Sequence, residues 1–361
     1  MKAQVVFLSG SLQLSGSTTW INTLIKGFEQ QQISCIHLIT GVPTSIKSSA
    51  TRVMYTGRPR QQWQLRLMRW LQLNKICKSF YKKQEANFYS KRTDQLLGAQ
   101  LAKKVLVIKD FTSYLPTYFC ADQFLIMAVL HQQYAERQQG YFYHQLCAVS
   151  ETVKQQSNQL GFNVTQVIYN PLDIKQLEHR ASEYQPDEQD YMVFVGKLHR
   201  EKGIIELLEG YHQLLQQKNI NLKLLYVGEG KDSQLLQDYI DQHDLADRVK
   251  LKGFQTNPYP YIKHAKLLVL PSYSEAMGYV AIEAAILKTP YLVSNFAAAS
   301  EFFPLAHTFG LHGQQLDREG MQHKILSLLQ EPQYQLNTGV IEKMQLESIV
   351  SIFYNQLKNQ E

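Results

Sequence analysis

The sequence has no long apolar run, and no stretch approaches the ~18–20 apolar residues that a helix needs to span a bilayer. The first apolar run, residues 5–8, is too short for a signal peptide and is typical of a β-strand. Cysteine is also scarce. The four cysteines, Cys35, Cys77, Cys120 and Cys147, form no Cys-x-x-Cys pair and lack metal-ligand spacing. They favour a reducing compartment, so we expect a cytoplasmic protein with ordinary thiols.

The composition that remains is that of a globular protein. Hydrophobic residues make up 44% of the 361 residues and charged residues 19%. At roughly 100–200 residues per domain, this length predicts two domains. Short apolar runs alternate with stretches of helical spacing, which is typical of βαβ units and a parallel sheet. The expected strands are residues 5–8, 35–39, 105–108 and 125–130 in the first half, and 192–195, 222–227, 249–251, 267–270 and 291–293 in the second.

A polar segment separates the two series of strands. Residues 173–190 contain Pro186 and a cluster of acids, and we interpret them as an interdomain linker. The sequence therefore predicts an α/β fold with an N-terminal domain over residues 1–172 and a doubly wound C-terminal domain over residues 191–343. Such sheets bind ligands at the carboxyl ends of their strands. The last helical stretch, residues 344–357, lies beyond both.

Two acids lie near the expected start of a helix that follows the 267–270 strand. This helix begins near Gly278, and its free backbone N–H groups suit a phosphate. Glu275 precedes that start, while Glu283 lies among apolar residues inside the helix, so its carboxylate needs a buried partner. Sugar hydroxyls are suitable donors. The alternatives are a core lysine or arginine for Glu283 and a favourable interaction with the helix dipole alone for Glu275.

Basic residues follow the first strand of the C-terminal domain. Gly196 closes that strand and allows a ligand to approach the backbone, and Lys197 and Lys202 follow in the loop before the next helix. Two lysines at the carboxyl end of a strand suit a diphosphate leaving group, which departs with added negative charge. The alternative is a solvated loop with no ligand.

Residues 225–233 imitate a dinucleotide-binding fingerprint. Gly228 and Gly230 match its first two glycines, but Ser233 stands at the third. The motif also follows the domain's second strand, whereas a nicotinamide site uses the first. A nicotinamide-dependent oxidoreductase is therefore the weaker enzyme hypothesis.

Four stretches of the sequence, taken in order, resemble the retaining glycosyltransferases of family 4, which have the GT-B fold. These stretches are residues 194–203, 226–230, 248–254 and 271–290. The resemblance is dense over residues 191–301 and thinner before them. It implies two Rossmann-like doubly wound domains that face each other across a cleft. It also implies that the C-terminal helix, within residues 344–361, packs on the N-terminal domain.

The resemblance implies catalytic and donor-binding roles for matching residues. Glu275 would hydrogen-bond the transferred sugar, Glu283 would bind the ribose, and His131 would face the donor sugar from the N-terminal domain. A structural role is the alternative for His131. The other implied positions are Gly196, Lys197, Lys202, Met277, Gly278 and Tyr279 at the diphosphate, Gly253 and Phe254 at the base, and Gly16 and Ser17 on the acceptor side.

Four positions depart from the family pattern. Lys197 stands where arginine is more frequent, and a lysine cannot form the bidentate hydrogen bonds that arginine makes with phosphate. Ala276-Met277 replaces Gly-Phe, and Lys288 replaces a glycine that commonly ends the helix. The departures affect donor identity and rate but remove no charged group that the transfer needs.

The implied reaction moves a sugar from a nucleotide-sugar, such as a UDP- or GDP-sugar, to a saccharide acceptor with retention of configuration. Family members of the cell-surface polysaccharide and lipopolysaccharide type lead us to expect a lipid-linked acceptor. No cofactor is expected, and the sequence lacks Asp-x-Asp, which favours transfer without a metal. The alternatives are another GT-B chemistry, such as an epimerase or phosphorylase, and a non-catalytic partner subunit.

Positive charge is concentrated in residues 52–92, which we call the basic segment. It holds eleven lysines and arginines, with Glu85 as its single acid, and interleaves them with aromatic and leucine residues such as Trp63, Leu67 and Trp70. A basic amphipathic segment with tryptophan suits an anionic membrane surface. We expect a peripheral protein on the inner face of the cytoplasmic membrane. A solvated helix and a nucleic-acid site are the alternatives, and we expect no nucleic acid.

Overall fold

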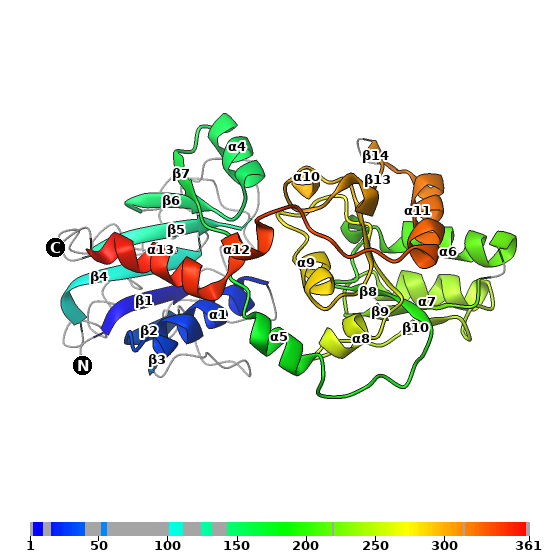
Figure 1. Cartoon of the computed structure of the whole chain (residues 1–361), viewed down its shortest axis with the longest axis horizontal. Helices are drawn as coiled ribbons and strands as arrows, with labels where there is room; N and C mark the ends of the chain where they lie inside the picture. Colours follow the sequence, from blue (N-terminus) through cyan, green and yellow to red (C-terminus); the bar gives the residue numbers. More distant parts are fainter. Residues whose placement is uncertain are drawn as a thin grey trace, which may run out of the picture. The chain divides into compact units, whose positions relative to one another are not determined.

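The computed structural model describes residues 3–9, 16–39, 52–55, 101–110, 124–131, 143–218, 220–312 and 315–358. The chain forms two compact units, each with its own sheet (Figure 1). Unit 1 contains residues 1–172 and 342–361, and unit 2 contains residues 173–341. Most of the basic segment, residues 56–92, lies outside the described residues.

Unit 1 is built on a parallel sheet. Its described strands have the order β3-β2-β1-β4-β5-β6-β7, and every pair is parallel. Their bounds are β1 (Ala3–Ser9), β2 (Cys35–Ile39), β3 (Arg52–Tyr55), β4 (Leu101–Asp110), β5 (Phe124–Leu130), β6 (Gln145–Ala148) and β7 (Val164–Val167). Helices α1 (Gly16–Gln30) and α4 (Glu151–Gln159) follow β1 and β6.

The C-terminal helix α13 (Leu346–Lys358) lies along this sheet (Figure 1). It packs against α1, where a Cβ added to Gly27 would lie 2.7 Å from side-chain atoms of Leu346 and Val350. The preceding chain is tied to the end of unit 1 because the Leu172 amide donates to the Met344 carbonyl at 2.7 Å. The C-terminal helix therefore completes unit 1 by covering one of its sheet faces.

Unit 2 holds a second parallel sheet, of order β10-β9-β8-β11-β12-β13. The strands are β8 (Tyr191–Val195), β9 (Lys223–Val227), β10 (Val249–Leu251), β11 (Leu267–Leu270), β12 (Tyr291–Ser294) and β13 (Thr308–Phe309). The order reverses between β8 and β11, so the loops after these two strands diverge at the point where doubly wound sheets bind ligands. A small hairpin, β14 (Leu311–His312) with β15 (Gln315–Leu316), follows.

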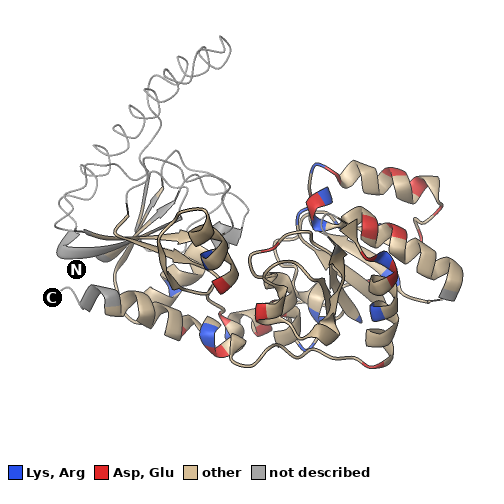
Figure 2. Cartoon of the chain, turned by 90° about the horizontal axis from the view of Figure 1, so that it is seen from above, with Lys and Arg blue, Asp and Glu red and all other residues tan. Residues whose placement is uncertain are grey.

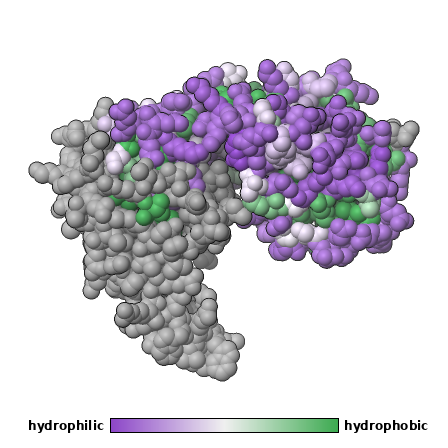
Figure 3. Space-filling view, turned by 90° about the horizontal axis from the view of Figure 1, so that it is seen from below, coloured by the Kyte–Doolittle hydropathy of each residue, from purple (hydrophilic) through white to green (hydrophobic). Residues whose placement is uncertain are grey.

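Helices cover both faces of this second sheet, so its central strands are apolar and buried. Those in unit 2 are α5 (Ile174–Arg180), α6 (Ile204–Lys218), α7 (Ser233–Gln242), α8 (Tyr259–Lys263), α9 (Tyr279–Ile286), α10 (Ala299–Phe302) and α11 (Arg318–Gln330), and α12 (Val340–Met344) leads back to unit 1. Over the described residues, charges of both signs are spread over the exterior of unit 2 (Figure 2), and the coloured part of the face shown in Figure 3 is mostly hydrophilic. In the described ranges, no helix is both long and apolar enough to cross a membrane.

Residues 173–190, which the sequence predicted to be a linker, are instead part of unit 2. Asp173 caps α5 by accepting from the Gln176 amide at 3.0 Å. Further along, the Glu188 carboxylate pairs with Lys223 at 2.5 Å and Lys252 at 3.2 Å, which attaches the segment to β9 and the end of β10. The hydrogen bond from Lys223 lowers the pKa of Glu188. The polar composition of this segment thus reflects side-chain contacts with the sheet edge.

Helix α9 is buried and ends at the predicted place, but without a glycine. The Lys288 amide donates to the Ala285 carbonyl and the Thr289 amide to the Ala284 carbonyl, which is the hydrogen-bond pattern of a Schellman motif. Lys288 adopts a φ of 58° to make this turn. The lysine therefore occupies the left-handed conformation that glycine adopts more easily.

Two of the four cysteines lie in the described ranges, and both are buried free thiols of unit 1. Burial raises the pKa of Cys147 to about 12 and also raises the pKa of Cys35. Neither thiol is poised to ionise near neutral pH, which agrees with the prediction of ordinary thiols.

Candidate functional site

The loops at the carboxyl ends of β8 and β9 pack directly on one another. Gly196 and Leu198 donate backbone hydrogen bonds to Val227 and Glu229, each at 3.0 Å. A Cβ at Gly228, whose φ is 141°, would lie 1.9 Å from the Gly196 carbonyl oxygen. The glycines that imitate a dinucleotide fingerprint are therefore explained by close loop packing.

The predicted sugar-binding and phosphate-binding charges meet in one ion pair. The Lys202 Nζ donates to Glu275 Oε1 at 2.6 Å, and the Ser272 hydroxyl donates to the same oxygen at 2.9 Å. The side chains of Lys202 and Glu275 are 26% and 21% exposed, so both remain accessible to a ligand. Lys202 comes from the loop after β8 and Glu275 from the loop after β11. The fold therefore joins the two central loops of the carboxyl edge through the two charges that were predicted to bind the donor.

Further contacts hold these two loops together. The Tyr273 amide donates to the Glu201 carbonyl at 3.0 Å, and the Tyr273 hydroxyl donates to Glu206 Oε1 at 2.6 Å. Burial and this carboxylate raise the pKa of Tyr273, so the phenol remains a hydrogen-bond donor. Gly203 completes the junction with a φ of 65°, because a Cβ there would lie 2.0 Å from the Pro271 carbonyl oxygen.

The start of α9 lies next in the chain, where the first backbone N–H groups of a helix have no carbonyl partner in a preceding turn. Gly278 has a φ of 66°, and a Cβ there would lie 2.9 Å from the Phe296 ring. Met277 is buried, and no acid occupies the first turn of α9. The predicted diphosphate positions Met277, Gly278 and Tyr279 therefore form a tight turn whose backbone dipoles favour an anion.

Glu283 is buried in α9 and has a protein partner from another helix. Its carboxylate accepts a hydrogen bond from the hydroxyl of Tyr259 in α8, and the guanidinium of Arg180 exerts an attractive charge on it. Burial outweighs both and raises the pKa of Glu283 to about 8. The sequence analysis offered a core lysine or arginine as the protein partner of Glu283, and Arg180 lies nearby. Tyr259 is a partner that the sequence did not suggest.

The raised pKa of Glu283 predicts that the stability of the folded protein depends on pH. Between its ordinary pKa of 4.5 and about 8, the folded protein retains a proton that the unfolded chain has lost. Stability should therefore fall as pH rises through this window, by up to about 1.4 kcal/mol per pH unit. Glu283→Gln keeps an acceptor for Tyr259 but cannot ionise, so its urea midpoint should change less between pH 5.5 and 9. Parallel pH profiles for the two proteins would contradict this assignment.

The Gly253-Phe254 turn lies at the carboxyl end of β10 on the same edge. Gly253 has a φ of 65°, and its carbonyl accepts from the Gly228 amide at 2.9 Å. Glu229 Oε1 accepts from the Phe254 amide at 3.3 Å, while the Phe254 side chain is 42% exposed. An exposed aromatic ring on a fixed turn provides a stacking surface for a planar group.

The remaining predicted residues are less connected. Lys197 is exposed at the end of β8, and its backbone carbonyl accepts from the His199 amide at 2.9 Å. In unit 1, His131 follows β5 and packs edge-on against Trp20 with ring centroids 4.6 Å apart. Gly16 and Ser17 are the first residues of α1. In the described ranges, no group of three or more His, Cys, Asp or Glu residues could hold a metal ion.

Residues 175–343, just under half of the chain, match the family described as glycosyl transferases group 1. An uncharacterized glycosyltransferase of Methanocaldococcus jannaschii is 30% identical over 140 residues, which cover 37% of this chain and 34% of that protein. The putative teichuronic acid biosynthesis glycosyltransferase TuaC of Bacillus subtilis is 32% identical over 125 residues, 33% of this chain and 28% of the relative. The matched region thus spans about a third of these relatives.

A Campylobacter jejuni enzyme described as an N-acetylgalactosamine-N,N'-diacetylbacillosaminyl-diphospho-undecaprenol 4-alpha-N-acetylgalactosaminyltransferase is 29% identical over 118 residues, 33% of this chain and 31% of that enzyme. The homologues of this region are therefore glycosyltransferases, and they include enzymes of polysaccharide and lipid-linked saccharide synthesis.

Solved structures resemble nearly the whole chain. The lipopolysaccharide outer core galactosyltransferase WaaB has a TM-score of 0.66 at 17% identity, with 99% of this chain and 100% of that chain covered. The sucrose-phosphate synthase of Thermosynechococcus elongatus has a TM-score of 0.71 at 16% identity, with the same coverage. These likenesses confirm the predicted α/β fold of the GT-B class.

Proposed function

We propose that the protein is a glycosyltransferase that moves a hexosyl group from a nucleoside diphosphate sugar to a saccharide acceptor, with retention and without a metal ion. The observation that carries the proposal is the Lys202–Glu275 pair of 2.6 Å, formed between the two loops of unit 2 at the switch point of its sheet. An ammonium and a carboxylate held side by side before α9 suit the two halves of such a donor, its diphosphate and its sugar.

Each group at the carboxyl edge of the unit 2 sheet would have a role in the sugar transfer. As the glycosidic bond to the donor phosphate breaks, negative charge develops on the departing diphosphate. Lys202, exposed Lys197 and the backbone N–H groups at the start of α9 would stabilise that charge. Glu275 would accept hydrogen bonds from sugar hydroxyls and Glu283 from the ribose, while Phe254 would stack on the base. His131 from unit 1 would face the donor sugar, and Gly16 and Ser17 the acceptor.

A thermal-shift screen against UDP-, GDP- and ADP-sugars tests the proposal, with NAD as the comparison ligand. One nucleotide class should raise the melting temperature in proportion to its binding, because a ligand that binds only the folded state stabilises it. Lys202→Met should reduce that shift, since it removes the positive charge that is proposed to bind the diphosphate. A larger shift with NAD than with every nucleotide-sugar would contradict the proposal.

We further propose a lipid-linked saccharide as the acceptor. The name of the Campylobacter jejuni relative describes an acceptor attached to diphospho-undecaprenol, and the solved WaaB acts on the lipopolysaccharide outer core. The basic segment supports the same proposal, because eleven cations interleaved with aromatic residues suit an anionic membrane surface. The protein would then work as a peripheral protein on the cytoplasmic face. Flotation with anionic but not neutral liposomes is the expected result, and equal recovery with both would reject the membrane role.

A further inference from the structure

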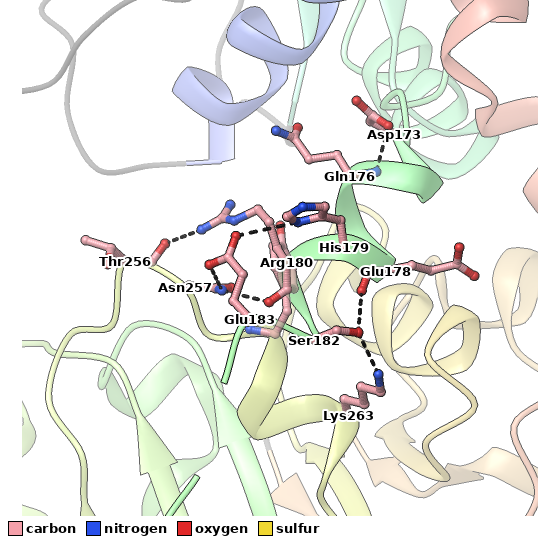
Figure 4. Close-up of polar contacts among 11 residues, drawn as sticks. Asp173, Gln176, Glu178, His179, Arg180, Ser182, Glu183, Thr256, Asn257 and Lys263 are labelled. Atoms are coloured by element: carbon pink, nitrogen blue, oxygen red, sulfur yellow. Dashed lines mark hydrogen bonds and ion pairs between the residues drawn. The ribbon is translucent and has the colours of Figure 1, made fainter. Parts of the chain in front are cut away.

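The segment that leads into unit 2 is attached to the loop that carries the proposed base contact. The Arg180 guanidinium donates to the Thr256 carbonyl at 2.6 Å, and the Asn257 side-chain amide donates to the Arg180 carbonyl at 2.8 Å and to the Glu183 carboxylate at 2.9 Å (Figure 4). The Tyr184 hydroxyl donates to the Asn257 carbonyl at 2.7 Å. These contacts hold residues 256 and 257 in place, two residues beyond the turn that ends with Phe254.

The same arginine also reaches the environment of Glu283. The Arg180 guanidinium carbon lies 5.0 Å from the centroid of the Tyr259 ring, a cation–π distance. The Tyr259 hydroxyl on that ring donates its hydrogen bond to the Glu283 carboxylate. One side chain from α5 therefore contacts both the base-side loop and the tyrosine that holds the ribose-side carboxylate.

We propose that Arg180 is a positioning residue for the nucleoside half of the donor site. Through Tyr259 it orients Glu283, and through Thr256 it fixes the chain that follows the Gly253-Phe254 turn. The inference rests on the proposed function, because it supposes that Glu283 binds ribose hydroxyls and Phe254 the base.

Charge gives this arrangement a second consequence. A carboxylate accepts hydrogen bonds from two ribose hydroxyls more strongly when it is ionised. The groups that face Glu283 are Tyr259 from α8, Tyr279 from its own helix and Arg180 from α5, and of these Arg180 carries the positive charge. Burial raises the pKa of Glu283 to about 8 against the Tyr259 hydrogen bond and the Arg180 charge, so removal of that charge would raise the pKa further and leave less of the carboxylate ionised at neutral pH. Loss of Arg180 should therefore matter most at neutral pH and least at high pH.

The test measures the affinity for UDP, GDP and ADP by calorimetry between pH 6.5 and 9.5, using the nucleotide that the wild-type protein binds most tightly. Arg180→Gln keeps a donor for Thr256 but removes the charge. It should weaken binding about three- to tenfold at pH 7, and the difference should close towards pH 9.5. Arg180→Lys retains the charge, so its profile should lie close to that of the wild type.

Lys263→Gln is the matched control. Lys263 is an exposed cation of α8 that donates to the Ser182 hydroxyl at 2.8 Å, so it also joins α8 to this segment (Figure 4). It is not among the groups that face Glu283. Its profile should match the wild type. A pH-independent loss in Arg180→Gln, or no loss at all, would overturn the positioning role while nucleotide binding by the wild type upholds the proposed function. Failure of the wild type to bind any of the three nucleotides would reject both.

Discussion

Glu275→Gln is expected to lower the rate of sugar transfer by about a hundredfold or more while changing nucleoside diphosphate affinity by less than about threefold. The carboxylate lies beside Lys202 and accepts from Ser272, so its orientation is set before any ligand arrives. A glutamine has nearly the same shape but presents one acceptor and no charge to the sugar. The loss should therefore fall on turnover, measured as product formed from the donor identified in the screen.

Two further variants serve as controls for the expected loss of turnover in Glu275→Gln. Ser272→Ala leaves the Glu275 charge in place and removes one hydrogen bond that orients it, so the transfer rate should fall only several-fold. Glu319→Gln removes an exposed carboxylate from the first turn of α11 and should behave as the wild type. Unchanged turnover in Glu275→Gln would remove this residue from the mechanism, whereas loss of both turnover and nucleotide affinity would indicate a damaged fold.

Gly203→Ala should give the largest loss of stability. Gly203 has a φ of 65°, and its added Cβ would lie 2.0 Å from the Pro271 carbonyl oxygen. Left-handed backbone alone costs a residue with a Cβ roughly 1–2 kcal/mol. The clash adds to this strain because the loop after β8 must separate from the end of β11. We expect a loss above about 3 kcal/mol for unit 2, seen as a lower urea midpoint.

Gly253→Ala separates the strain from the clash. Gly253 has the same φ of 65°, but its added Cβ would meet only Glu229 Oε1, at 3.7 Å. This variant should therefore show the conformational strain alone and lose roughly 1–2 kcal/mol. Equal destabilisation of the two variants would show that the close packing of Gly203 on Pro271 is not what requires a glycine. If Gly203→Ala does not fold, the well-folded Gly253→Ala still shows that strain alone was not the cause.

Local pattern predicted the elements of the fold well. Strands of a parallel sheet covered on both faces are continuous apolar runs, so residues 192–195 predicted β8 (Tyr191–Val195) and residues 267–270 predicted β11 (Leu267–Leu270). Glu283 could be recognised as a buried carboxylate because apolar residues surround it in the sequence. The predicted linker failed for the opposite reason: polar composition does not distinguish a solvated segment from one whose side chains bind a sheet edge, as Glu188 does.

The sequence by itself determined the two α/β units, the buried helix at Glu283 and the set of charges at the carboxyl edge, because periodicity and burial are local properties. Only the tertiary structure decided the pairing of those charges. Lys202 and Glu275 are 73 residues apart, and they meet because their strands β8 and β11 are neighbours in the sheet. The same holds for Arg180 of α5 and Tyr259 of α8. No sequence spacing relates these two helices, and the side chains meet only because the folded sheet and its loops bring the helices together.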